Sequence, residues 1–204
     1  MGAILIRPRR IPEALFAGAG AALLVVAHLI SPLAALHAIE KGVAVYLFLI
    51  GMMALAELAR HEGVFDWIAA FALEAARGSQ ARLFALVFGV GVVVTAILSN
   101  DATAVVLTPA IAATIARARV PPLPYLFACA FVANAASFVL PISNPANLVV
   151  FGDALPALGP WLAAFGIPAL LAIAATFAAL RFEWRTSLAA PCAQPGGAPP
   201  LSPA

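Results

Sequence analysis

Residues 97–109 read ILSNDATAVVLTP, and they place a Ser-Asn-Asp triplet inside a long run of alanine, valine, leucine and isoleucine. A carboxylate near the centre of a bilayer costs about 2.5 to 3.5 kcal/mol on insertion scales, so Asp101 is a functional hypothesis by default. The triplet ends one apolar segment and begins the next. Helix ends expose carbonyls and helix starts expose amides. A polar solute at this break could therefore be bound by backbone dipoles as well as by side chains. The alternative is that the triplet only caps the second segment, which is compatible with binding.

The composition of the chain is typical of a polytopic membrane protein. Of its 204 residues, 64% are hydrophobic and 10% are charged, far from the balance of a soluble domain. Cys129 lies in an apolar run and Cys192 in a polar tail, so no disulfide is predicted. The net charge of +2 comes from arginines at the ends of apolar segments rather than from a basic run. We therefore expect no nucleic-acid partner.

Six segments approach the length of a membrane helix, which needs about 20 predominantly apolar residues. They are residues 11–30, 42–59, 81–98, 102–118, 124–140 and 159–182. The intervening segment 62–79 predicts an amphipathic helix at the membrane interface, with Trp67 as an anchor; a solvated connecting helix is the equal alternative. Its apolar stripe consists of Val64, Ile68, Phe71 and Ala75.

The basic residues predict the orientation, because cytoplasmic loops carry an excess of Lys and Arg. If the N-terminus is inside, every basic residue except Lys41 lies inside as well. Lys41 then belongs to an outer loop over residues 31–41. We expect a multi-pass protein of the cell (inner) membrane with both termini in the cytoplasm.

The segments on either side of the triplet enter and leave from the same side. Neither charge nor length separates a re-entrant hairpin over residues 81–118 from two full crossings. The turn itself favours the hairpin, since it has no charged or Gly/Pro-rich loop like residues 31–41. Irregular backbone at membrane depth is tolerated only where protein or a water-filled cavity surrounds it.

A second polar break, PISNPAN, covers residues 141–147. Asn144 followed by Pro145 has the form of an N-cap and a first helical residue, so a new half-helix is expected to end near Asp153. Residues 124–154 would then form a broken helix. Paired interrupted segments mark the midplane site of secondary transporters; the alternative is an outer loop after a full span. Asn134 and Ser137, on one face before this break, either line the cavity or form interhelical hydrogen bonds.

Three stretches carry a resemblance to a known family. They are LSNDATAVVLTP, PPLPYLFACAFVANAASFVLPISNPANLVV and YLFLIGMMALAELARHEGVFDW. They resemble the arsenite permease (ArsB-like) branch of the ion transporter superfamily, which also holds NhaD-type sodium/proton antiporters and divalent-anion or citrate carriers. The resemblance covers most of residues 7–185. The pairing of SND with SNPAN is specific for the superfamily and weak for the substrate.

The resemblance implies two inverted repeats, each with a re-entrant hairpin and a broken helix that together form the solute site. At the hairpin tip the matching residues are Ser99, Asn100, Asp101 and Thr103. At the break they are Ser143, Asn144, Pro145 and Asn147. Dicarboxylate carriers usually have Ser-Asn-Thr at the tip, whereas Asp101 would repel an anion and can exchange a proton or hold a cation. A neutral solute such as arsenous acid, or a proton or sodium, therefore suits this tip better.

The length predicts one half of such a transporter, its N-terminal repeat. Residues 1–185 would form the membrane repeat, and residues 186–204 a disordered tail or linker between repeats. With the hairpin counted as zero, the chain crosses an even number of times, which cannot invert a following copy. We therefore expect a fragment or split gene in which residues 1–6 are the remnant of a missing span. A second repeat or a homo-oligomer would complete the protein.

Taken together, the sequence predicts an all-α polytopic membrane protein that is a carrier and not an enzyme, without a cofactor or metal. The first expectation is proton-coupled efflux of arsenite or antimonite, giving arsenical resistance, with Asp101 as the proton-coupling group. Sodium/proton antiport, small-anion carriage of the citrate or dicarboxylate type, and a non-transporting fragment or assembly subunit are the alternatives. Because no GxxxxGK[ST] loop is present, ATP-driven transport would need a separate ATPase subunit. Glu57, three residues before Arg60, predicts an interfacial ion pair rather than a coupling role.

Overall fold

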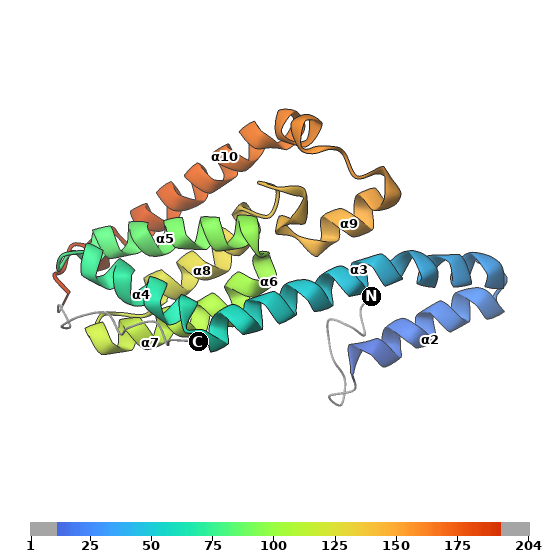
Figure 1. Ribbon diagram of the computed structural model, residues 1–204, viewed down its shortest axis with the longest axis horizontal. Helices are drawn as coiled ribbons and strands as arrows, with labels where there is room; N and C mark the ends of the chain where they lie inside the picture. The colour runs from blue at the N-terminus through green and yellow to red at the C-terminus, as the bar shows by residue number, and fades with distance from the viewer. Residues whose placement is uncertain (1–11, 193–204) are drawn as a thin grey trace. The chain divides into compact units, whose positions relative to one another are not determined.

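The computed structural model describes residues 12–192, and every element in this part of the chain is a helix (Figure 1). The all-α prediction is therefore confirmed. Residues 1–11 and 193–204, including the expected remnant of an upstream span at residues 1–6, lie outside the described residues. The chain divides into two compact units, Met1–Tyr46 and Leu47–Ala204.

The first unit contains α2 (Glu13–Val26) and the beginning of α3 (Pro32–His61). The hydroxyl of Ser31 accepts the Ala34 amide at 3.1 Å, and Pro32 suits a first helical turn because its missing N–H is not needed there. The predicted outer loop at residues 31–41 is therefore wrong, since residues 32–41 are helical. The 14 residues of α2 rise about 21 Å, less than the hydrocarbon thickness of about 30 Å, so α2 is shorter than the predicted span.

The second unit holds a helical hairpin. Its arms are α5 (Gln80–Ile97) and α7 (Thr108–Ala118), joined at a tip by α6 (Asn100–Ala102) and the π-helix η2 (Thr103–Leu107). Figure 1 shows α5 running toward the tip and α7 running back. The helix α8 (Leu123–Ala135) packs on α5, and α10 (Leu158–Glu183) packs on α8. The first arm lies within one residue of its predicted bounds, 81–98, and the second ends at the predicted residue 118, although its predicted beginning at residue 102 falls in α6 and η2. Re-entry into the membrane stays a prediction.

The helix α4 (Val64–Ala75) packs against both arms of the hairpin. The face that it buries consists of Phe65, Ala69, Ala72 and Leu73. On the predicted apolar stripe, Val64 and Phe71 are exposed, and the ring of Phe71 stacks on Trp67 at 5.6 Å between centroids. The helix is thus apolar on two sides, because the small residues that serve protein packing lie beside a separate stripe of large residues.

The helices α5 and α8 approach each other tightly at Gly91. A Cβ atom built there would lie 2.5 Å from Cγ1 of Val132, which is itself fully buried. Real Cβ atoms do not come so close, so the two backbones approach only because position 91 has no side chain. Gly89, on the same helix, has nothing within 4 Å of the corresponding position.

We expect Gly91→Ala to lower the free energy of unfolding by about 1 to 3 kcal/mol relative to Gly89→Ala, because overpacking a tight contact forces side chains or backbone to move. Both substitutions gain the same helix propensity, about 1 kcal/mol, so their difference isolates the packing effect. Thermal unfolding of the purified chain in detergent measures it. Equal stability of the two variants would contradict the close approach.

The second break interrupts the helical path as predicted. The helix α8 ends at Ala135, and after a turn come the 3₁₀ helix η3 (Pro141–Ser143), α9 (Pro145–Phe151) and the 3₁₀ helix η4 (Gly152–Ala154). The side chain of Asn144 accepts the Ala146 amide at 2.9 Å, which confirms the predicted N-cap. The fully buried Trp161 donates its ring N–H to the carbonyl of Phe138 at 3.0 Å and so anchors the turn to α10.

The residues after α10 fold back onto the start of α5. The short helix α11 (Arg185–Leu188) packs against α5, and Leu188 is buried. Gln80 donates its side-chain amide to the carbonyl of Pro191 at 3.1 Å, and the Cys192 amide donates to the carbonyl of Gly78 at 2.9 Å. In the described part of the predicted disordered tail or linker, residues 186–192, specific backbone partners therefore hold the chain in place.

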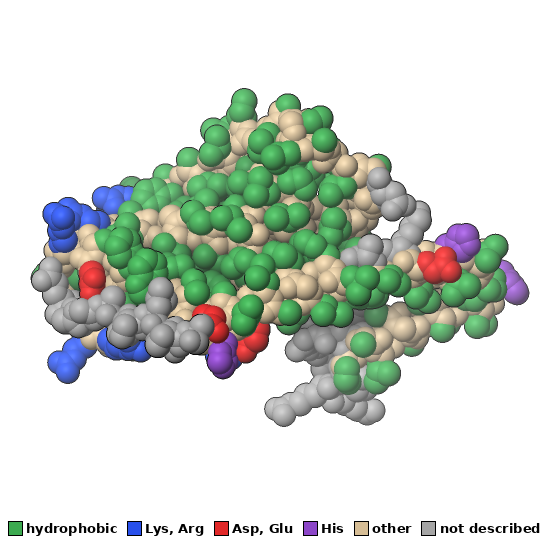
Figure 2. Space-filling view, in the orientation of Figure 1, with side chains coloured by type: hydrophobic (Ala, Val, Ile, Leu, Met, Phe, Trp, Pro, Cys, Tyr) green, Lys and Arg blue, Asp and Glu red, His purple; other side chains and the backbone are tan. Residues whose placement is uncertain are grey.

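Among the described residues, four helical segments are long and apolar enough to cross a membrane. They are Pro32–His61, Gln80–Ile97, Asn100–Ala118 and Leu158–Glu183. Hydrophobic side chains cover the visible face of the second unit, and blue basic side chains gather at one end (Figure 2). Arg82 in the first turn of α5, Arg117 in the last turn of α7 and Arg181 in the last turn of α10 belong to this end.

Candidate functional site at the hairpin tip

The hairpin turns at a strained serine. Ser99 has φ 148° and ψ 167°, a backbone region that is essentially restricted to glycine, and its side chain is 3% exposed. Its hydroxyl accepts the Ala102 amide at 3.3 Å, so Ser99 caps α6. Strain of about 1 to 3 kcal/mol persists only where the surroundings fix the conformation, and such strain clusters at functional sites.

A hydrogen bond between two threonine hydroxyls holds the hairpin tip to α5. The Oγ1 atoms of Thr95, on α5, and Thr103, at the start of η2, lie 2.8 Å apart, and both residues are fully buried. Thr103 belongs to the predicted tip, whereas Thr95 is a functional residue that the sequence reasoning missed. Its signal was present: Thr95 is the one polar side chain in the apolar arm between Gln80 and Ser99 apart from Arg82.

Thr95→Val is expected to lower the free energy of unfolding by about 1 to 3 kcal/mol, because it removes the shorter of the two hydrogen bonds of the buried Thr103 hydroxyl and leaves only the 3.5 Å contact with the carbonyl of Ser99. Thr95→Ser keeps the hydroxyl and should retain most of the stability. Thermal unfolding of both variants in detergent tests this. An unchanged midpoint for the valine variant would show that the hydroxyl pair does not hold the tip.

The second arm begins with a π-helix rather than a regular α-helix. The hydroxyl of Thr108 donates to the carbonyl of Thr103 at 2.8 Å, which bridges the wide turn. Pro109 has no N–H, so position 109 donates to neither Val105, four residues earlier, nor Ala104, five residues earlier. Single π-turns within α-helices occur frequently at functional sites.

One hydrogen bond joins the second polar break to α5. The hydroxyl of Ser143 donates to the carbonyl of Ala96 in the last turn of α5 at 3.0 Å, and it accepts the Leu140 amide at 3.0 Å. Ser143 is fully buried. The last four carbonyls of a helix have no partner within the helix, so a serine from the second break satisfies one of them. The second break is thus bonded to the last turn of α5, three residues before Ser99.

The other residues predicted at the second break bond to backbone. Asn147 is buried and donates its side-chain amide to the carbonyls of Ser137 and Pro141, at 3.2 and 3.1 Å. Asn144 caps α9, and Pro145 is its first residue. These three residues shape the break in this conformation.

Asn134 and Ser137 bond to carbonyls of their own segment. Their side chains donate to the carbonyls of Ala130 and Ala133, at 3.0 and 2.7 Å. Asn134 is exposed and Ser137 is buried. Neither side chain forms the interhelical hydrogen bond that was one of the two expectations.

A cavity of about 300 Å³ lies in the second unit between the end of α3 and the hairpin tip. Of the ten predicted site residues, Ser99 and Asp101 line it. The other lining residues are Leu49, Met52, Met53, Ala54, Ala56, Glu57, Ala102, Val105 and Val106. The lining therefore combines an apolar wall with two carboxylates and contains no basic side chain.

The tip also holds a polar atom without a partner. The Oδ1 atom of Asn100 is buried and accepts no hydrogen bond, whereas buried polar groups are normally paired. Asp101, the next residue, is exposed and lines the cavity. Two neighbouring residues thus offer acceptor oxygens at the tip.

Two interrupted helical segments are a feature of secondary transporter repeats, and comparison with known proteins agrees. Residues 1–192 match the CitMHS family, described as citrate transporters. The chain belongs to the CitMHS citrate transporter family. This family is part of the ion transporter superfamily, and membership supports a membrane carrier rather than an enzyme.

The curated relatives of this CitMHS chain are longer proteins. An uncharacterized transporter of Mycobacterium bovis is 28% identical over 149 residues, which cover 72% of this chain and 35% of the relative. A 46 kDa membrane protein of Mycobacterium leprae is 26% identical over 148 residues, covering 72% and 34%. An uncharacterized transporter of Synechocystis is 28% identical over 152 residues, covering 74% and 34%. The chain thus spans about a third of the length of these relatives. No solved structure matches it significantly.

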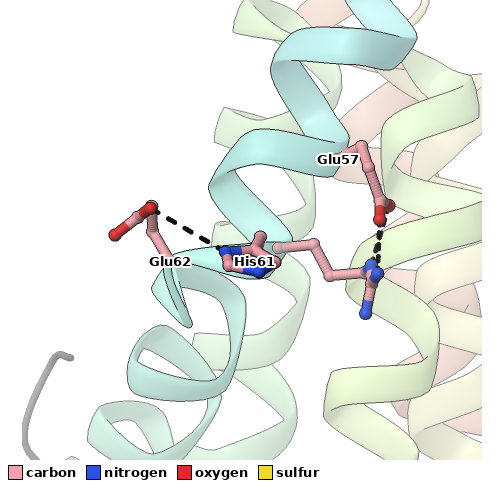
Figure 3. A network of polar contacts seen from close by, with 4 residues as sticks. Glu57, His61 and Glu62 are labelled. Carbon is pink, nitrogen blue, oxygen red and sulfur yellow. Dashed lines mark hydrogen bonds and ion pairs between the residues drawn. The ribbon is translucent and has the colours of Figure 1, made fainter. Parts of the chain in front are cut away.

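Glu57 is the cavity residue of this CitMHS chain that the sequence reasoning set aside. It forms the predicted ion pair: Nε of Arg60 donates to Oε2 of Glu57 at 2.7 Å, and a second contact joins the same two groups. Figure 3 shows this pair beside the pair of His61 and Glu62, in which Nδ1 of His61 lies 3.9 Å from Oε1 of Glu62. The ion-pair prediction is confirmed, but it did not reveal that Glu57 also faces the cavity.

Proposed function

We propose that this chain forms the N-terminal repeat of a secondary active transporter whose solute binds in the cavity beside the hairpin tip. The observation that carries the proposal is the hydrogen bond from Ser143 to the carbonyl of Ala96, which ties the second polar break to the last turn of α5, close to the tip whose residues Ser99 and Asp101 line that cavity. Discontinuous helices that meet at the membrane midplane are the usual site of solutes and coupling ions in such transporters. Asp101 is the group that changes protonation between the inward-facing and outward-facing states.

The proposed reaction is proton-coupled efflux of arsenite or antimonite, as in the arsenite permease branch of the superfamily. The charge of the lining supports it, because two carboxylates and no basic side chain disfavour an anion and leave neutral arsenous acid unopposed. The hydroxyl groups of arsenous acid are hydrogen-bond donors, which suits the acceptor oxygens of Asn100 and Asp101. The protein would act in the cell (inner) membrane with both termini in the cytoplasm, where its arginines are expected.

Two other solutes have observations in their favour. The description of the matching family favours a small carboxylate anion such as citrate. The carboxylate of Asp101 in the cavity favours sodium in exchange for protons. A second repeat or a second copy of this chain would complete the transporter, and ATP-driven transport would require a separate ATPase subunit.

Transport by proteoliposomes that hold the purified chain, with an imposed pH gradient, tests these proposals. We expect gradient-dependent movement of arsenite that exceeds that of citrate and of sodium. If citrate moves and arsenite does not, the substrate is a carboxylate anion rather than a neutral solute. If only sodium-dependent proton movement is seen, the protein is a sodium/proton antiporter. If none of the three solutes moves, the chain does not transport by itself and serves as an assembly subunit.

A further inference from the structure

The cavity beside the hairpin tip contains a second carboxylate to which the proposed function assigns no role of its own. Glu57 lies on α3 and Asp101 on the tip, and both line the same cavity. Glu57 and Asp101 are 44 residues apart along the chain (101 − 57), so the fold brings the two carboxylates to one cavity. Among the described residues the lining has no basic side chain to balance them, and its other members there are apolar apart from Ser99.

We propose that Glu57 is a specificity-determining residue that acts with Asp101 to make the cavity admit cations and neutral solutes and exclude anions. The proposal deepens the function proposed above, since it names the charge class of the solute, and it rests on that function only for the solute's identity. Arg60 pairs with Glu57 without lining the cavity, so it offsets part of the negative charge from outside.

The position of Glu57 on its helix supports this role. Met53 precedes it by one helical turn and lines the cavity on the same face, with 60% of its surface exposed. Glu57 itself is exposed, and Arg60 is the partner that its oxygens have among the described residues. A solute that reaches Asp101 past Met53 therefore passes within one turn of the Glu57 carboxylate.

The local charge around Glu57 is mixed, which makes the contribution of each group separable by substitution. Arg60 is its ion-pair partner, and His61 and Glu62 follow in a second pair at the end of α3. Glu74 is an exposed carboxylate on α4 that does not line the cavity, so it serves as a matched control.

The test measures the charge preference of the cavity without requiring transport. In the full chain in detergent, with Cys129→Ala and Cys192→Ser as background, Met53→Cys provides a reporter thiol. Its rates of reaction with a cationic and an anionic methanethiosulfonate of equal size are compared with those of a free thiol. We expect the cationic reagent to react faster than the anionic one. Glu57→Gln and Asp101→Asn should each lower this ratio of rates about fivefold, because each removes one unit charge about 8 Å from the thiol and the two reagents differ by two charges. Arg60→Gln should raise the preference, and Glu74→Gln should leave it unchanged.

Each failure has a distinct meaning. An unchanged ratio in Glu57→Gln would overturn the role of Glu57, whatever Asp101→Asn does. A change in Glu57→Gln without one in Asp101→Asn would instead count against the proposed solute site at the tip. Absence of reaction with either reagent would overturn a water-accessible cavity, and size-exclusion profiles identical to that of the parent chain show that the variants remain folded.

Discussion

Asp101→Asn is expected to reduce proton-driven transport on the order of 100-fold, the scale on which a positioned proton-transferring group acts. The substitution keeps the shape of the side chain, while it removes the proton that the carboxylate would exchange. The tip should therefore fold as before, because Ser99 and the Thr95–Thr103 pair hold it independently of Asp101. The measurement is solute movement in proteoliposomes at several imposed pH gradients.

The matched control for this prediction is Asp66→Asn. Asp66 is an exposed carboxylate in the first turn of α4 that does not line the cavity, so its neutralisation should leave transport unchanged. In Asp101→Asn, any residual movement should no longer depend on the pH gradient. Full gradient-dependent arsenite transport in that variant would remove the coupling role of Asp101.

Ser143→Ala is expected to have the second large effect, on both stability and transport. The substitution removes two buried hydrogen bonds at once, leaving the Leu140 amide and the Ala96 carbonyl without this partner. Stranded buried groups cost about 1 to 3 kcal/mol each, so a loss of about 2 to 4 kcal/mol is expected in the free energy of unfolding. Thermal unfolding in detergent measures the stability, and the proteoliposome assay measures the transport.

The matched control here is Ser137→Ala, because Ser137 is also buried but its hydroxyl donates only to Ala133 in the preceding turn. Removing the Ser137 hydroxyl should lower the free energy of unfolding by about 1 kcal/mol or less, since the carbonyl of Ala133 loses only one supplementary hydrogen bond. If Ser137→Ala and Ser143→Ala destabilise the protein equally, the bond between the second break and α5 has no special role.

The sequence predicted the arms of the hairpin closely because their signals are local. Ser79 caps α5 through the Arg82 amide, and long apolar runs follow on both sides of the triplet. The N-cap at Asn144 was predictable for the same reason. The predicted outer loop at residues 31–41 was wrong because Pro32 and Lys41 were taken as loop signals, although proline is favoured at a first helical position and a lone lysine does not end a helix.

Contacts between distant segments could not be predicted in this way. The bond from Ser143 to Ala96 and the shared cavity of Glu57 and Asp101 depend on how helices pack, and no local spacing encodes them. The strained backbone of Ser99 was also hidden, because serine gives no signal for a region that glycine normally occupies. Two features were missed for this reason: Thr95, whose partner Thr103 lies on another element, and the place of Glu57 in a cavity that it shares with Asp101.

The π-helix at Thr103–Leu107 has a further consequence for the direction of the tip. One additional residue in a turn rotates everything before it by about 100° relative to a regular α-helix. Asp101 therefore does not lie on the face that counting back from Ile111 or Ile115 would give it. The rotational register of the carboxylate is set by the backbone bonding of five residues, and a substitution that returned them to an α-turn would aim Asp101 elsewhere while leaving α7 in place.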